Sequence, residues 1–221
     1  ASWNASDRPI GGIASRSFDV MKIVLLGMTT TMRAHRFAFL VLATLAAAFS
    51  LTGAARAETP AGYMQRVQNE LLAAQRSGSS VAFSNVLRKH MDVPSIGLTA
   101  LGEHARTLPK ADRPAYFNGM IRFISNYAAK EAPKYPIASA VVIGQGEETV
   151  GGSTVDSRIT LRSGESYDIR WKIVRRGNSY KVRDAQVVGF WMSSFLDTLF
   201  QNYISENGNN PRALILALNR S

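Results

Sequence analysis

Residues 166–175 read SYDIRWKIVR, and apolar and polar side chains alternate along this stretch. Positions 168, 170 and 172 are charged. The residues that alternate with these positions would point to the opposite face, and they are Tyr167, Ile169, Trp171 and Ile173. A period of two is typical of a β-strand with one buried face and one solvated face. The stretch therefore predicts a sheet that is covered on one side only.

Further strands are predicted on both sides of this stretch. Residues 140–143, 153–162 and 179–188 have strand-like composition, and glycine-containing turns separate them at positions 151–152, 163–164 and 177–178. Short strands joined by such turns are typical of consecutive antiparallel hairpins. We expect an antiparallel meander of about four strands.

The rest of the chain has a helical period. Tyr63, Val67 and Leu71 fall on one face after the helix-starting pair Thr59-Pro60. A longer helix after position 109 carries an apolar stripe of Phe117, Met120, Ile121, Ile124 and Tyr127. Prolines at 133 and 136 end this half, and two more helices are predicted over 190–205 and from 211 onward. The pattern predicts an α+β fold with helices packed on one face of a curved antiparallel sheet.

Residues 32–57 have the three parts of an export signal. Positions 33, 35 and 36 form a basic leader, residues 37–51 carry no charge, and Ala55-Arg56-Ala57 resembles a signal-peptidase site. The alternative is a membrane anchor, because about twenty uncharged residues can cross a bilayer. The many Ala and Thr residues and the A-x-A site favour cleavage.

On this interpretation residues 1–31 are an unassigned upstream segment, 32–57 a signal peptide and 58–221 a single domain. The last range has 164 residues (221 − 57), enough for one hydrophobic core, and the chain has no cysteine. It holds 20 Lys and Arg against 14 Asp and Glu, which is +6 of the total charge of +10. This scattered basicity fits anionic lipid surfaces better than nucleic acid. A solvated positive surface is the alternative.

Several short motifs occur in a characteristic order. The helical half contains DVPSI at 92–96, ALG at 100–102, YF at 116–117 and FISNY at 123–127. The second half contains YDIRWK at 167–172, YKVRD at 180–184 and VVGFWM at 187–192. In this order they resemble the MlaC/toluene-tolerance family of periplasmic phospholipid-binding proteins. The sequence departs from the family pattern at 104–106 and at Pro114.

This resemblance implies a periplasmic carrier that is soluble after signal cleavage and has no cofactor. Such a carrier holds phospholipid acyl chains in an apolar cavity between sheet and helices. It moves lipid between an inner-membrane ABC transporter complex and an outer-membrane lipoprotein complex, which maintains outer-membrane lipid asymmetry. A hopanoid-associated branch is also similar, so a hopanoid or another envelope lipid is an alternative cargo.

The candidate lipid-binding wall consists of apolar residues on predicted helices and strands. A domain of this size also needs such residues simply to fill its core, and composition alone favours that second interpretation. Only the resemblance favours a cavity. The candidate residues are Phe117, Ile121, Ile124, Ile159, Leu161, Ile169, Trp171, Ile173, Val187, Phe190, Trp191, Phe195 and Leu199.

Enzymatic alternatives have weaker support. The sequence has no G-x-S-x-G motif and no cysteine nucleophile, and His90 and His104 lack the usual zinc spacing. Glycines at 144, 146, 151 and 152 do not match the dinucleotide-binding pattern. Asp168 or Asp184 could be the base of a small-pocket enzyme of isomerase-like fold, although structural roles are favoured. We therefore predict no enzyme and no metal site, with an interaction module as a third possibility.

The export signal gives a first prediction. We expect the amino terminus of the mature protein to lie at or within a few residues of Glu58. Mass analysis of the protein recovered from the cell envelope measures this directly. A mature chain that still carries residues 37–55 would contradict the soluble carrier.

Overall fold

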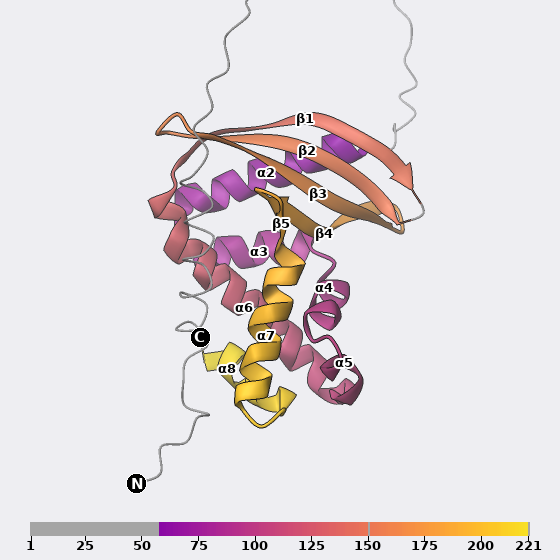
Figure 1. The fold of residues 1–221 in the computed structure, drawn as a ribbon. Helices are drawn as coiled ribbons and strands as arrows, with labels where there is room; N and C mark the ends of the chain where they lie inside the picture. Colours follow the sequence, from indigo (N-terminus) through magenta and orange to yellow (C-terminus); the bar gives the residue numbers. More distant parts are fainter. Residues whose placement is uncertain (1–57, 150, 221) are drawn as a thin grey trace, which may run out of the picture.

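A computed structural model describes residues 58–149 and 151–220. The predicted upstream segment and signal peptide at 1–57 lie outside these described residues. Figure 1 shows a curved sheet on one side of the molecule and helices stacked beneath its concave face. No helix among the described residues has both the length and the hydropathy needed to span a membrane.

The helical half begins with α2 and continues to the start of the sheet. Thr59 caps α2, because its hydroxyl accepts a hydrogen bond from the Gly62 amide at 3.1 Å, and Pro60 occupies the first turn. Gly78 ends the helix in the left-handed conformation. The elements are α2 (Pro60–Ser77), α3 (Ser80–His90), α4 (Val93–Ala100), α5 (His104–Thr107), η2 (Lys110–Asp112), α6 (Arg113–Glu131) and η3 (Ala132–Lys134).

The sheet has five antiparallel strands in the order β1-β2-β3-β4-β5. Register shifts in β1, and one in the β3–β4 pair between Lys172 and Ile173, are bulges of the kind that bend strands. The strands are β1 (Ile137–Thr149), β2 (Gly152–Leu161), β3 (Ser166–Arg176), β4 (Ser179–Val187) and β5 (Phe190–Trp191). Two helices follow, α7 (Met192–Glu206) and α8 (Pro211–Arg220).

The α+β prediction is confirmed, with two differences in detail. The first strand extends over Ile137–Thr149 rather than only 140–143, because its glycine-containing second half pairs with β2 despite lacking a strand-like pattern. A fifth strand follows a turn at Val188 and Gly189, both with positive φ. The last helix but one therefore begins at Met192 and not at 190.

The buried side chains form two main clusters. The larger one lies among α4, α6, α7 and α8, away from the sheet, and includes Tyr116, Met120, Phe123, Phe200, Tyr203 and Leu214. The second joins α2 to the sheet and includes Tyr63, Met64, Val67, Val155, Ile173 and Tyr180. Helix α2 thus packs directly on the sheet, below β1 and β2 in Figure 1.

Two glutamines of α2 bind the free edge of β1. The side-chain oxygen of Gln65 accepts from the Val142 amide at 3.3 Å, and its nitrogen donates to the Ala140 carbonyl at 3.5 Å. Gln75 accepts from the Ile137 amide at 3.4 Å and donates to the Tyr135 carbonyl at 2.9 Å. The helix therefore supplies hydrogen bonds that a neighbouring strand would otherwise provide.

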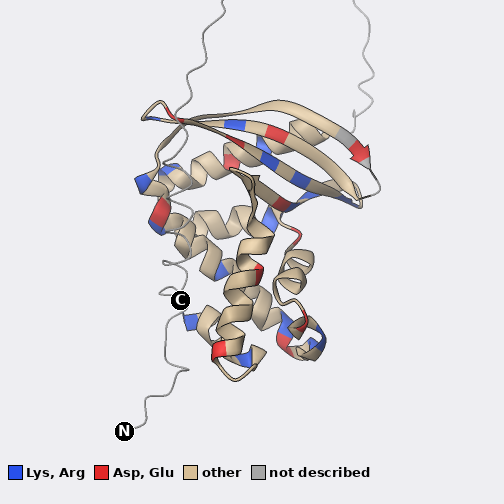
Figure 2. Ribbon diagram, viewed as in Figure 1, with Lys and Arg blue, Asp and Glu red and all other residues tan. Residues whose placement is uncertain are grey.

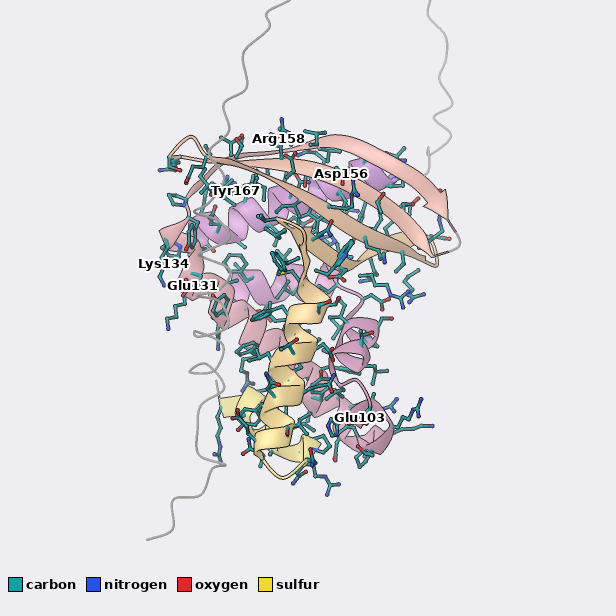
Figure 3. The ribbon with its side chains drawn as sticks, in the orientation of Figure 1. Glu103, Glu131, Lys134, Asp156, Arg158 and Tyr167 are labelled. Carbon is teal, nitrogen blue, oxygen red and sulfur yellow. The ribbon has the colours of Figure 1, made fainter. Side chains whose placement is uncertain are left out.

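The outer face of the sheet carries a ladder of opposite charges. Asp156 lies opposite Arg170, and Arg158 lies opposite Asp168, in the register of β2 and β3. Each pair makes two hydrogen bonds of 2.7–2.9 Å. Figure 2 shows the alternating blue and red segments, and Figure 3 shows Asp156 and Arg158 on this face. The predicted alternation of β3 is confirmed, with Ile169 and Ile173 buried on the opposite face.

A buried histidine connects α2 and α3. His90 is 3% exposed, and its Nε2 lies 2.9 Å from a Glu70 oxygen while its Nδ1 lies 3.2 Å from the Tyr63 hydroxyl. Burial lowers the pKa of His90 below its usual value, although Glu70 opposes this effect. The fold therefore favours the neutral imidazole.

The turn into β2 gives a prediction about the stability cost of replacing Gly152. A side chain at Gly152 would place Cβ 2.1 Å from the Ile173 carbonyl oxygen, and φ there is +117°. We expect Gly152→Ala to lower the free energy of unfolding by about 1–3 kcal/mol, measured by urea denaturation. Gly164→Ala is the control, since Gly164 also has positive φ but open space around it. Equal losses in the two variants would show that the carbonyl contact is unimportant.

A further prediction concerns the pH dependence of stability. In the unfolded chain His90 binds a proton near pH 6.5, whereas in the folded protein it does so only at lower pH. The contribution of His90 to the free energy of unfolding is therefore complete above about pH 6.5 and is lost as the pH falls below that value. The slope is at most about 1.4 kcal/mol per pH unit. We expect His90→Gln to flatten this loss between pH 6.5 and 5, measured by chemical unfolding, and His104→Gln to leave it in place. An unchanged slope in His90→Gln would contradict the assignment.

Candidate functional site

An apolar cavity of about 330 Å³ lies between α2, α3, the end of α6 and the strands β1 to β3. Pockets that hold small molecules usually measure about 300–1,000 Å³, whereas packed protein cores contain few voids larger than a water molecule. A cavity of this size is therefore a candidate binding site. Its lining residues are Gln68, Leu71, Leu72, Gln75, Phe83, Ala128, Glu131, Ala132, Tyr135, Ile137, Ala140, Ile159, Leu161 and Trp171.

The walls come from elements that are fixed in different ways. Helix α2 is attached to the edge of β1 through Gln75, and the inward face of β2 contributes Ile159 and Leu161. The Trp171 indole nitrogen donates to the Ser157 hydroxyl at 2.6 Å, which orients the ring on β3. This partly buried hydrogen bond satisfies the one polar atom of the indole, so the ring can form apolar wall.

One end of the cavity, the polar end, carries its charged lining residue. Glu131 lines the cavity and accepts hydrogen bonds from Lys134 at 2.8 and 2.9 Å, and Tyr135 beside them is exposed. Figure 3 shows Glu131 and Lys134 together where α6 ends. We infer that this end opens to solvent, while the apolar residues of the sheet form the interior.

Three residues of the predicted wall line the cavity, namely Ile159, Leu161 and Trp171. The helix residues of that set lie elsewhere. Leu199 is buried in the helical cluster, and Phe117, Ile124 and Phe195 pack against it. Ile121 is buried on α6 outside the cavity lining.

The remaining predicted residues lie on strands, away from the cavity lining. Ile173 belongs to the cluster between α2 and the sheet, and Ile169 is buried on the same strand. Val187 lies at the end of β4, and Phe190 on β5 is 55% exposed. Lys172 lies over the Trp191 ring, with 5.3 Å between its Nζ atom and the ring centroid.

Helix α2 and its neighbours contribute lining residues that the predicted wall does not include. Leu71 and Leu72 of α2 and Phe83 of α3 line the cavity, as do Ala128 and Ala132 near the end of α6. The stripe of Tyr63, Val67 and Leu71 was a usable signal for an apolar face. A helical period does not show which of several amphipathic helices covers the sheet.

The titratable candidates for catalysis have structural partners. Asp184 accepts hydrogen bonds from the Ala185 and Ser193 amides at 2.9 and 3.0 Å, so it fastens the start of α7. The hydrogen bond from Arg158 lowers the pKa of Asp168. The described residues contain no group of three or more His, Cys, Asp or Glu placed to hold a metal ion. A second hollow of about 710 Å³, near α5 and the start of α8, is lined largely by polar residues such as Glu103, His104 and Asn210.

The fold and the cavity define a class: an α+β protein with an apolar cavity between its curved sheet and the helix packed on it. The sequence places the chain more narrowly within that class. The family model described as MlaC protein matches residues 62–220, which confirms the resemblance of the motifs. The chain belongs to the MlaC family.

A solved structure has a similar fold. It is described as the phospholipid-binding protein from Ralstonia solanacearum in complex with a phospholipid. Its TM-score is 0.61 at 16% sequence identity, and the match covers 72% of this chain and 94% of the other. A comparison with curated proteins finds no match.

Proposed function

We propose that this protein is a periplasmic phospholipid carrier that holds acyl chains in the cavity between α2 and the sheet. The observation that carries the proposal is the cavity itself, about 330 Å³ in volume with a predominantly apolar lining. Membership of the MlaC family and the phospholipid in the similar Ralstonia protein support the same ligand class.

The free energy needed to move a phospholipid through water without a carrier is large. Moving two acyl chains with about thirty methylenes from an apolar environment into water costs on the order of 24 kcal/mol, at about 0.8 kcal/mol per methylene. Free diffusion of phospholipid across an aqueous compartment is therefore negligible. A protein wall of Ile159, Leu161 and Trp171, together with the leucines of α2, replaces the water around the part of the chains that lies in the cavity.

Binding and carriage need no chemistry from the protein, so the proposed role is not enzymatic. In this role the protein exchanges lipid with an inner-membrane ABC transporter complex and an outer-membrane lipoprotein complex. The lipid-binding role of the predicted residues outside the cavity, such as Phe117 and Phe190, stays a prediction. A hopanoid or another envelope lipid is the alternative cargo.

Lipid extraction tests the proposal. We expect the purified protein, residues 58–221, to release phospholipid into organic solvent, with mass spectrometry identifying it. Recovery of a hopanoid would replace phospholipid as the cargo. Recovery of no lipid, together with failure to take up phospholipid from vesicles, would contradict the carrier.

A cavity-filling variant tests the location. Ala128 lines the cavity, so Ala128→Trp should occupy its space and reduce bound phospholipid at least several-fold without removing any packing group. Ala73→Trp is the matched control, since Ala73 lies exposed on α2. Circular dichroism checks that both variants fold. Equal lipid content in the two variants would place the binding site elsewhere.

A further inference from the structure

One buried polar side chain faces this apolar cavity without a hydrogen bond. Gln68 on α2 is 2% exposed and lines the cavity. Neither its Nε2 nor its Oε1 has a hydrogen-bond partner among the described residues. The other buried side-chain atoms in this condition belong to Arg113, Ser153 and Asn207, and none of those residues lines the cavity.

The other glutamines that α2 directs toward the sheet have partners. Gln65 and Gln75 each use both amide atoms on backbone groups of β1 or of Tyr135 just before it. A buried amide without partners destabilises a fold, because it loses its hydrogen bonds to water and gains none in return. Met or Leu would fill position 68 without that cost. The amide therefore has a use that the protein's own hydrogen bonds do not explain.

We propose that Gln68 recognises a neutral oxygen of the bound lipid inside the cavity, either an ester carbonyl or a hydroxyl. The amide nitrogen donates to either kind of oxygen, and the amide oxygen accepts from a hydroxyl. The inference rests on the proposed function, since it assigns a polar contact within the same cavity.

The surroundings of Gln68 favour a neutral group. The apolar residues Leu71, Leu72 and Trp171 line the same space, and an ionised group is costly in such a wall unless it is paired. The one charged lining residue, Glu131, is already bonded to Lys134. An ester or hydroxyl oxygen needs only a hydrogen bond, which a single amide provides.

The position of Gln68 places this contact away from the polar end of the cavity. Gln75 lies near that end, bonded to the Tyr135 carbonyl, and Gln68 precedes it by two helical turns. At 1.5 Å per residue this separation is about 10 Å along α2. The recognised oxygen therefore lies inside the cavity, whereas a charged lipid headgroup would remain toward Glu131 and Lys134.

Chain-matched lipids test the proposal. The probes are a diester phosphatidylglycerol, its diether analogue without ester carbonyls, and a diether analogue with one hydroxyl on a chain. Each competes with a fluorescent phospholipid for the delipidated protein. We expect the wild type to bind an oxygen-bearing probe about three- to tenfold more tightly than the plain diether, since one neutral hydrogen bond has this effect.

The variant Gln68→Met keeps the length of the side chain and removes both hydrogen-bonding atoms. It should bind all three lipids equally well and melt at least about 2 °C higher than the lipid-free wild type, because a buried amide without partners is gone. Gln201→Met is the matched control, since Gln201 lies on α7, which contributes nothing to the cavity lining. It should keep the wild-type preference.

The outcomes distinguish an ester carbonyl from a hydroxyl, and they test the role of Gln68 separately from the carrier function. Preference for the diester identifies the ester carbonyl, and preference for only the hydroxylated diether identifies a hydroxyl. Equal binding of all probes by the wild type, or a preference that survives in Gln68→Met, would overturn the role of Gln68 while leaving the carrier intact. Binding of no probe would contradict the carrier and this inference together.

Discussion

The attachment of α2 to the sheet determines the rest of the structure. The helix packs apolar residues such as Tyr63 and Val67 on the concave face, and Gln65 and Gln75 bond the backbone at the edge of β1. Both sets of contacts form on the same sheet, and β-bulges bend the strands of that sheet. Close packing on the sheet therefore lies around Tyr63, Met64 and Val67 in the first half of α2, and the cavity lies beside its second half.

The largest buried cluster and the cavity lie in different parts of the protein. The large cluster among α4, α6, α7 and α8 lies away from the cavity and does not need a ligand to be well packed. The cavity lining includes polar atoms, namely the amide of Gln68 and the indole nitrogen of Trp171 that donates to Ser157. Packing in the large cluster can offset the cost of leaving this space open. That cost arises because an empty apolar cavity lacks favourable contacts along its wall.

Much of the fold could be predicted because its signals are local. The alternation in β3, the proline before α6 and the glycine turns between strands each depend on neighbouring residues only. The two-residue strand β5 has no period to detect, and the polar second half of β1 pairs for reasons that lie in β2. The site was harder to predict, since Phe117 and Leu71 have equally apolar surroundings in sequence. Only tertiary packing decides that Leu71 faces the cavity and Phe117 the helical cluster.

The edges of the sheet have a consequence for how other proteins can recognise this one. Gln65 and Gln75 occupy backbone groups along β1, and the Gln145 side chain also accepts from the Ala61 amide of α2 at 3.2 Å. On the far side, β4 receives the Asp92 amide at the Val182 carbonyl, with a distance of 2.8 Å, and ends against the two residues of β5. Along 137–142 of β1, and at Val182 of β4, main-chain groups that an incoming strand would need are already bonded. These parts of the two edges are therefore poor sites for strand addition, and a partner that contacts them would recognise side chains and shape.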